Sequence, residues 1–368
     1  MRIALIAPPW LSIPPIAYGG IETVIDDLAK GFTAVGHEVL LCATGDSTCP
    51  VPTTWSFSES QSMRMGTSAA ELRQVLFSYA ASGDADIIHD HTLIGPVFAA
   101  ERSLRNVVTT CHGAFDEDLQ KIYQAAAPRV PTIAISQHHA RSAGAIPIAK
   151  VIHHGVNPDR FPVGSGSGGY LAFLGRMAPA KGVVTAIRVA RAAGLELRIA
   201  AKMREPEECQ YFEESVRPLL GSDATFLGEL GFADKVELLG NASALLNPID
   251  WPEPFGMVMI EALACATPVV ARRRGSVTEI LQDGLTGFIC DSEDDLVEAV
   301  RQTSSLDRGA CRRSVERYFS AQRMVDDHLD FYQSLLDSER IVDLRKTPSD
   351  SAHRGRGPSR SEPEFQWA

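Results

Sequence analysis

The chain has 368 residues, of which 45% are hydrophobic and 22% are charged, a balance typical of globular proteins with large buried cores. This length exceeds one ordinary α/β domain and suits two. The formal net charge of −11 argues against a dedicated nucleic-acid-binding protein. No apolar run is long enough for a transmembrane segment. The seven cysteines form no C-x-x-C pair and indicate reduced thiols in a cytoplasmic protein.

Short apolar runs alternate with longer amphipathic stretches in the first part of the chain. The expected strands are Arg2–Ala7, Glu38–Thr44, Asp86–His91, Val107–His112, Thr132–Ser136 and Lys150–Val156. Helical patterns lie between them, for example at Glu22–Val35 and Glu71–Ser82. Because the strands are apolar on both faces, we expect a parallel sheet that helices cover on both sides. Residues 1–163 are therefore predicted to form an N-terminal Rossmann-like domain.

A Gly/Ser segment at 164–169 is predicted to be a flexible linker, after which the alternation restarts. The expected strands of a second Rossmann-like domain, at 170–312, are Tyr170–Gly175, Leu195–Ala201, Ala224–Leu227, Ala242–Asn247, Pro268–Ala271 and Gly287–Cys290. Its expected helices are Gly182–Ala193, Glu205–Leu219, Gly256–Ala264 and Asp294–Thr303. Terminal helices are expected at 313–338, with a return to the N-terminal domain as one option. Residues 347–368, almost without aliphatic side chains, are predicted to be a disordered tail.

Two glycines, Gly19 and Gly20, lie between the first strand and the first helix. They permit close backbone approach, and the helix N-terminus offers free N–H donors to an anion or a sugar hydroxyl. The alternative is a plain turn in which Glu22 interacts favourably with the helix dipole.

Histidines follow several of the predicted strands. His89 and His91 share one face of their strand, and His112 follows the next strand along the chain. Because ligands bind beyond the carboxyl ends of parallel strands, we expect polar lining of an interdomain cleft. A metal site is the alternative, but no nearby carboxylate cluster completes one. His153 and His154 follow another strand and either line the same cleft or cap the strand.

Two cations, Arg176 and Lys181, lie five residues apart where the first strand of the second domain passes into a helix. The guanidinium of Arg176 can bind a diphosphate through two N–H groups, and the ammonium group of Lys181 can add a compact positive charge. The alternative is a basic loop that is simply exposed to solvent.

The segment around Glu253 carries the most specific pattern. Pro252 and Pro254 keep Glu253 out of regular helix, and Gly256 opens a helix whose free N–H groups can hold a phosphate. Glu261 lies in that helix among apolar residues, where a carboxylate is costly unless it is hydrogen-bonded. Two ribose hydroxyls would supply such bonds, and a buried glutamate satisfied by backbone is the alternative.

Taken together, these residues resemble the retaining family 4 glycosyltransferases, which have the GT-B fold. The resemblance covers most of residues 1–335. The matching motifs are Gly19-Gly20-x-Glu22, Thr109-x-x-His112-Gly113, Ser136, Gly155-Val156, Gly175-Arg176 with Lys181-Gly182, Glu253-x7-Glu261, Pro268-Val269-Val270, Gly275, Glu279 and Asp283-Gly284-x-x-Gly287. The chain departs from the family at His154, where Asn is frequent, and at Ala201 and Ala266, where Gly is frequent.

The resemblance implies an α/β protein of GT-B architecture, with two Rossmann-like domains facing across a deep cleft. Its N-terminal domain would bind a hydroxyl acceptor and its C-terminal domain a nucleotide-sugar, which is a co-substrate; no other cofactor and no metal are implied. A UDP-sugar is favoured, with a GDP-sugar as the alternative. The activity would be metal-independent hexosyl transfer with retention of the anomeric configuration.

The resemblance also implies roles for individual residues. Arg176 and Lys181 would hold the donor diphosphate, Glu261 the ribose and Glu253 the transferred sugar. In the same donor site would lie Phe255, with Gly256 and Met257 offering backbone N–H groups. The facing N-terminal domain would contribute His112, which would approach the sugar. It would also contribute Gly19 and Gly20, which would approach the phosphates or the sugar. The catalytic group would thus comprise His112, Glu253, Arg176 and Lys181.

Two other functions remain open on this sequence. A sugar-nucleotide 2-epimerase shares the fold but would require other carboxylates near the sugar. A non-catalytic nucleotide-sugar sensor would not be expected to keep every charged site residue. The identity of the acceptor is open. Residues 1–162 hold 11 Lys and Arg against 15 Asp and Glu, which mildly favours a soluble acceptor over an anionic lipid surface.

Overall fold

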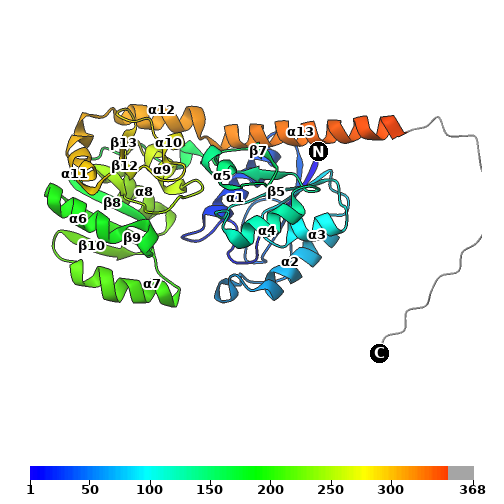
Figure 1. Ribbon diagram of the computed structural model, residues 1–368, viewed down its shortest axis with the longest axis horizontal. Helices are drawn as coiled ribbons and strands as arrows, with labels where there is room; N and C mark the ends of the chain where they lie inside the picture. The colour runs from blue at the N-terminus through cyan, green and yellow to red at the C-terminus, as the bar shows by residue number, and fades with distance from the viewer. Residues whose placement is uncertain (347–368) are drawn as a thin grey trace, which may run out of the picture.

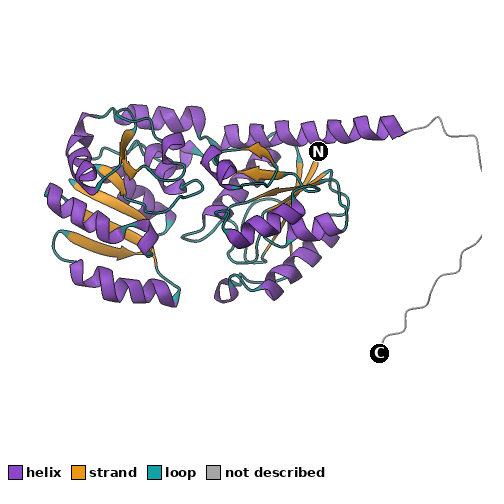
Figure 2. Ribbon diagram, viewed as in Figure 1, coloured by secondary structure: helices purple, strands orange, loops and turns teal. Residues whose placement is uncertain are grey.

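The computed structural model describes residues 1–346, with side chains described as far as residue 338. It shows two α/β halves lying side by side, each with its own sheet (Figure 1). Helices pack on both faces of each sheet (Figure 2). This is the doubly covered parallel architecture that the apolar strands predict. The tail expected at 347–368 lies outside the described residues.

The sheet of the N-terminal half is parallel throughout, in the order β3-β2-β1-β4-β5-β6-β7. Its strands are β1 (Arg2–Ile6), β2 (Glu38–Ala43), β3 (Thr53–Trp55), β4 (Ile87–Asp90), β5 (Val107–Thr110), β6 (Thr132–Ala134) and β7 (Ile148–Val151). Its helices are α1 (Gly20–Ala34), α2 (Ser68–Ala81), α3 (Gly95–Glu101), α4 (Glu117–Ala126) and α5 (Gln137–Ser142). Successive side chains of β1 point to opposite faces of the sheet, which explains why helices cover both faces. Ile3 and Leu5 join a core with α1, whereas Ala4 and Ile6 join a core with α2, α3 and α4.

The sheet of the C-terminal half is also parallel, in the order β10-β9-β8-β11-β12-β13. Its strands are β8 (Tyr170–Arg176), β9 (Glu196–Lys202), β10 (Ala224–Gly228), β11 (Ala244–Asn247), β12 (Val269–Arg272) and β13 (Gly287–Cys290). Its helices are α6 (Val183–Ala193), α7 (Pro206–Tyr211), α8 (Phe232–Asn241), α9 (Met257–Ala264), α10 (Val277–Ile280) and α11 (Glu293–Gln302). Consecutive residues of β8 again enter opposite cores, since Tyr170 and Ala172 pack with α9 and Leu171 and Phe173 with α6.

Three local expectations differ from the structure. The three-residue strand β3 was not predicted, and β7 begins and ends earlier than the expected Lys150–Val156. Val156 leaves the sheet because its N–H donates to Phe319 O, at 2.9 Å, near the start of the last helix. The helix expected over Glu205–Leu219 is α7 followed by a π-helical turn and a short 3₁₀ turn that contains Pro218.

The 164–169 segment, which is predicted to be a flexible linker, is hydrogen-bonded to the backbone of the second half. The N–H groups of Gly164, Gly166 and Gly168 donate to backbone carbonyls of Cys265, Gly240 and Asn241, at 2.9–3.0 Å. A Cβ at Gly164 would stand only 2.0 Å from Gly240 O. The glycine at 164 therefore serves close backbone approach, which composition alone cannot distinguish from flexibility.

The last two helices join the halves. Helix α12 (Arg308–Tyr318) packs on α9, and α13 (Ala321–Lys346) runs along the N-terminal half (Figure 1). Val325 and Tyr332 enter the core that contains Phe32 of α1, and the rings of Phe32 and Tyr332 lie 5.7 Å apart. None of the described helices combines the length and apolar character that a membrane crossing requires.

The close contact between α1 and α13 gives a stability prediction. An alanine Cβ at Gly31 would stand 2.3 Å from Val325 Cγ2. Although alanine favours an isolated helix by about 1 kcal/mol over glycine, Gly31→Ala is expected to lower the free energy of unfolding by about 1–3 kcal/mol through overpacking. Urea unfolding measures this change.

Gly83→Ala is the control, because the new methyl group would meet only Ala80 O at 3.9 Å. We expect it to leave the unfolding midpoint unchanged. The double variant Gly31→Ala/Val325→Ala should be destabilised by less than the sum of its single variants, since the smaller side chain relieves the clash. Wild-type stability of Gly31→Ala would contradict the described helix contact.

Candidate active site

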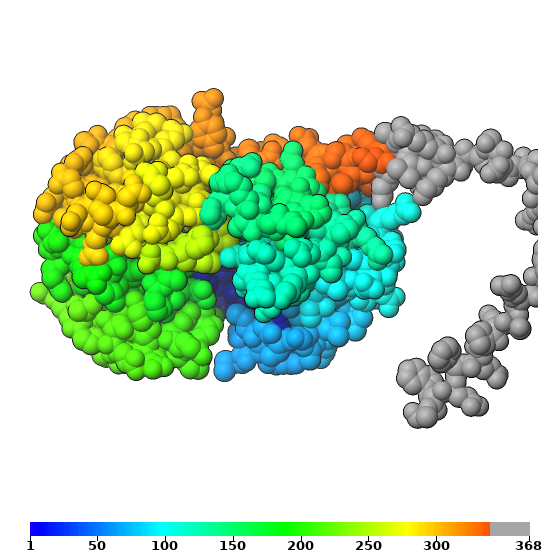
Figure 3. Space-filling view, in the orientation of Figure 1, coloured from blue at the N-terminus to red at the C-terminus, as the bar shows by residue number. Residues whose placement is uncertain are grey.

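A cavity of about 550 Å³ lies between the two halves. The space-filling view shows the hollow where they meet (Figure 3). Residues that follow β1, β5, β8 and β11 line it, so it opens at the carboxyl ends of both sheets. The ten residues to which the family resemblance assigns a role all line it: Gly19, Gly20, His112, Arg176, Lys181, Glu253, Phe255, Gly256, Met257 and Glu261.

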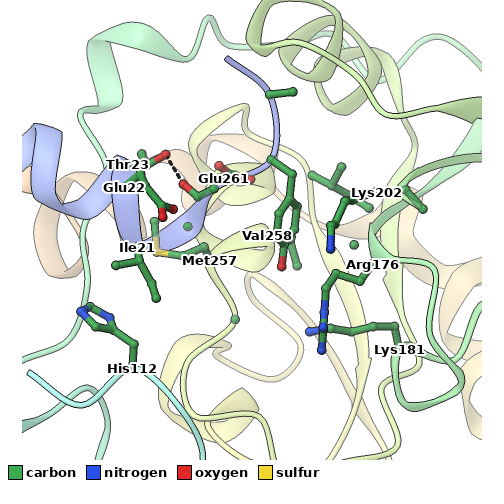
Figure 4. A pocket seen from close by; sticks show the side chains of 18 of the residues that line it. Ile21, Glu22, Thr23, His112, Arg176, Lys181, Lys202, Met257, Val258 and Glu261 are labelled. Atoms are coloured by element: carbon green, nitrogen blue, oxygen red, sulfur yellow. Dashed lines mark hydrogen bonds between the residues drawn. The ribbon is translucent and has the colours of Figure 1, made fainter. Parts of the chain in front are cut away.

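The two predicted cations occupy different environments. Arg176 ends β8 and keeps 45% of its side chain exposed, with Nη1 4.0 Å from Glu208 Oε1. Lys181 lies in the 3₁₀ turn before α6, and its side chain is only 12% exposed. Its ammonium group forms an ion pair with Glu253 and lies 5.4 Å from the ring centroid of Trp251. Two residues predicted independently for the site are therefore each other's partners. Figure 4 shows Arg176, Lys181 and Lys202 on one side of the cavity and His112 on the other.

The loop that carries Glu253 is fixed from behind. Ser276 N–H donates to Glu253 O at 3.2 Å, and Ser276 Oγ donates to Phe255 O. From the N-terminal half, Ser136 Oγ donates to Pro254 O at 2.6 Å. Gly256 caps α9 with φ of +88°, a conformation that favours glycine. The loop thus presents the free N–H groups at the start of α9 to the cavity.

Glu261 has a partner that the sequence did not reveal. Its carboxylate accepts a hydrogen bond from Lys235 Nζ of α8, at 2.5 Å, and both side chains are mostly buried. The expected alternative of a glutamate satisfied by backbone is therefore wrong. Lys235 precedes Glu261 by 26 residues on another helix, so no local sequence pattern connects them.

The start of α1 faces the start of α9 across the cavity. A Cβ at Gly20 would lie 3.8 Å from Met257 Cγ. In the first turn of α1, Glu22 is 4% exposed, lines the cavity and forms no ion pair within the described residues. Burial raises the pKa of Glu22 from an ordinary 4.5 to about 7. The sequence suggested a favourable interaction of Glu22 with the helix dipole and a place in the family motif, but not its burial.

The histidines divide into two groups. His112 and His154 line the cavity, with ring centroids 5.3 Å apart, whereas His89 and His91 are buried behind them and do not line it. The expectation that His89 and His91 line the cleft is therefore wrong. His91 Nδ1 lies 2.9 Å from His112 Nε2. Burial, with smaller contributions from His139 and His328, lowers the pKa of His112 to about 3, so the ring is neutral at pH 7.

Charges in the cavity are matched. The lining includes five cationic side chains and five carboxylates. Pairs that were not predicted are Lys202 with Glu205 and Arg204 with Glu229, the latter at 2.6 Å. Glu229 also accepts a hydrogen bond from Tyr18 N–H of the other half, at 3.0 Å. In the described part of the chain, no cluster of three or more His, Cys, Asp or Glu side chains is arranged to hold a metal ion.

Two family models match consecutive parts of the chain. The model described as Glycosyltransferase Family 4 matches residues 18–160, and the model described as Glycosyl transferases group 1 matches residues 159–318. The phosphatidyl-myo-inositol mannosyltransferase of Mycolicibacterium smegmatis is 25% identical over 366 residues, covering 86% of this chain and 89% of that protein. The alpha-maltose-1-phosphate synthase of Mycobacterium tuberculosis is 24% identical and covers 91% of this chain and 100% of that protein.

Solved structures share the fold. AviGT4, a glycosyltransferase involved in avilamycin A biosynthesis, is 25% identical with a TM-score of 0.69, covering 92% of this chain and 98% of that one. Anabaena HepE in complex with UDP and glucose has a TM-score of 0.71 at 18% identity, covering 91% of this chain and 100% of that one. The family models, the relatives and the two-sheet architecture together show that this chain belongs to the family 4 glycosyltransferases, with the GT-B fold.

Proposed function

We propose that this glycosyltransferase moves a hexose from a nucleoside-diphosphate sugar to a hydroxyl group of an acceptor, with retention of the anomeric configuration and without a metal ion. The observation that carries the proposal is the cavity itself. It brings Arg176, Lys181 and the start of α9 together with two carboxylates on one half and His112 on the other.

The donor fits this arrangement group by group. Its diphosphate would lie against Arg176, Lys181 and the free N–H groups at the start of α9, which together supply positive charge to a dianion. Its ribose hydroxyls would bind Glu261, and the hexose would lie between Glu253 and His112. A UDP-sugar is favoured because HepE, which shares the fold, has been solved with UDP-glucose, and a GDP-sugar is the alternative.

The same cations would replace a metal ion in catalysis. As the bond between the sugar and the phosphate breaks, negative charge grows on the leaving phosphate. Arg176, Lys181 and the helix terminus are already in place to stabilise that charge.

Retention is supported by the state of the carboxylates. An inverting enzyme needs a general base behind the anomeric carbon. Four of the five carboxylates that line the cavity are ion-paired, namely Glu205, Glu229, Glu253 and Glu261. The fifth, Glu22, has its pKa raised to about 7 by burial, which gives it the pKa of a general base, and its variant is therefore part of the test below. A front-face transfer needs none of them, because the leaving phosphate can take the acceptor proton.

The acceptor would bind against the N-terminal half. The lining residues from that half include Trp10, Leu11 and Met65, and they include no Lys or Arg. Because this part of the lining offers no cationic side chain, it favours an acceptor that presents a hydroxyl group and no phosphate where it contacts the protein.

Donor affinity tests the proposal. Arg176→Ala and Lys181→Ala should each weaken UDP binding at least tenfold, because each removes charge-assisted hydrogen bonds of about 1.5–3 kcal/mol. Isothermal titration calorimetry measures the change. Arg188→Ala is the control: it removes an exposed cation of α6 that pairs with Glu293 of α11, and it should leave UDP affinity unchanged. Wild-type UDP affinity in the Arg176→Ala/Lys181→Ala double variant would refute the diphosphate site.

Product stereochemistry tests the mechanism. Proton NMR of the first product formed in EDTA from an α-linked donor should show an α linkage. Glu22→Gln should keep this outcome and lose less than tenfold in turnover, whereas removal of a general base costs about 10²–10⁴. Activity that disappears as the pH falls through 7, together with a β-linked product, would identify Glu22 as the base of an inverting enzyme. Loss of turnover in EDTA that Mg²⁺ or Mn²⁺ restores would contradict metal independence.

A further inference from the structure

Behind His112 lies a buried row of histidines that the proposed transfer does not use. His91 directly follows β4, and its ring lies between two others, with centroids 4.0 Å from His89 and 5.2 Å from His112. His89 is fully buried and both its ring nitrogens are engaged, Nε2 with Thr110 Oγ1 at 2.8 Å and Nδ1 with Tyr332 Oη of α13 at 2.6 Å. Among the described residues, the ring of His91 has one hydrogen-bond partner, His112.

This single partner restricts where the proton of His91 can lie. His91 Nδ1 is 2.9 Å from His112 Nε2, while His91 Nε2 is buried and has no hydrogen-bond partner among the described residues. If His112 donated, His91 Nδ1 would accept and the proton of His91 would have to lie on Nε2. A buried N–H donor would then be orphaned, which costs about 1–3 kcal/mol. If His91 donates, the unpartnered atom is a lone pair, which proteins tolerate better than an orphaned donor.

The second arrangement also fixes His112. Its Nε2 accepts from His91, so the proton of the neutral ring must lie on Nδ1. Nδ1 of His112 has no partner in the described protein, and the residue lines the cavity. A ligand in the cavity would therefore meet a ring N–H donor and not a lone pair.

We infer that His91 is a positioning residue, which donates its Nδ1 proton to His112 and thereby holds His112 in the orientation and tautomer that offer Nδ1–H to the transferred sugar. A sugar hydroxyl or ring oxygen is the group that such a donor would recognise. The inference rests on the proposed function only for the identity of that ligand, because the tautomer is a property of the free protein.

Burial of the whole row supports a neutral pair. Burial lowers the pKa of His91 well below its ordinary value, and the neighbouring His89 and His112 lower it further. A doubly protonated His91 would place a charge beside the rings of His89 and His112, where no carboxylate of the described residues pairs with it. His89 cannot form a hydrogen bond with His91 Nε2, because both ring nitrogens of His89 are already hydrogen-bonded, one to Thr110 and the other to Tyr332.

The tautomer can be read without substrate. Long-range ¹H–¹⁵N spectra of the full chain labelled with [¹⁵N]histidine report which nitrogen of each ring carries the proton, and His112→Ala assigns the signal. We expect His112 to be protonated on Nδ1 and bare on Nε2 at pH 7. Protonation of His112 on Nε2 in the wild-type protein would overturn the inference, whatever the protein's activity.

Two substitutions separate positioning from packing. His91→Asn places an amide N–H near the Nδ1 position and should keep the His112 tautomer and turnover within about threefold of wild type. His91→Leu keeps apolar volume but cannot donate, and should lower kcat at least tenfold while UDP affinity changes less than twofold. A rate loss of that size corresponds to about 1.4 kcal/mol, a typical hydrogen bond. His37→Asn, at the far end of α1, is the control and should match wild type.

The outcomes are distinct. Equal loss of kcat in His91→Asn and His91→Leu, with parallel falls in melting temperature and UDP affinity, would show a packing role and overturn the inference. An unchanged kcat in His91→Leu would do the same. Wild-type turnover in His112→Ala would refute the role of His112 in the proposed function, whereas the tautomer in the spectra would still decide the assignment of the His91 proton.

Discussion

The arrangement of the cavity depends on one constraint, which is that charges held away from water must be paired. Lys181 with Glu253 and Lys235 with Glu261 are largely buried, and neither partner could remain charged there alone without a large desolvation cost. A donor that enters would therefore exchange partners. Its phosphates would share Lys181, and its hydroxyls would bind the carboxylates. Binding would be favoured by groups already placed for it, because the charges of Lys181 and Lys235 are already largely removed from solvent in the free protein.

The N-terminal half depends on a different kind of support. Helix α13 crosses from the C-terminal half, and Arg323 on it donates to the backbone carbonyls of His153 and His154, at 2.7 and 3.0 Å. Tyr332 on the same helix binds His89. The residues behind His112 are thus anchored by a helix that begins at the end of the other half. This connection links the position of the histidine row to the way the two halves pack.

Much of the fold and part of the site could be predicted from the sequence, because the informative residues lie at strand ends. Arg176, Glu253 and His112 each follow or end a strand, and parallel sheets bring such positions to one edge. Lys235 could not be found in this way, since it lies within α8 and its pairing with Glu261 depends on how two helices pack. Lys202 ends β9 and pairs with Glu205 three residues later, so the same rule could have identified it, although it was not among the predicted residues. Glu22 was visible but was interpreted from its own helix alone. The glycine at 164 shows a further limit, because composition does not separate flexibility from close backbone contact.

The central claim is that one donor molecule binds to both halves at once. Hydrogen exchange measured by mass spectrometry, with and without a saturating UDP-sugar, tests this directly, because the first N–H groups of a helix have no intrahelical partner and exchange readily unless a ligand covers them. We predict slower exchange in peptides covering residues 19–24 and in peptides covering residues 256–262. Protection confined to other surfaces, with neither helix start affected, would contradict the account.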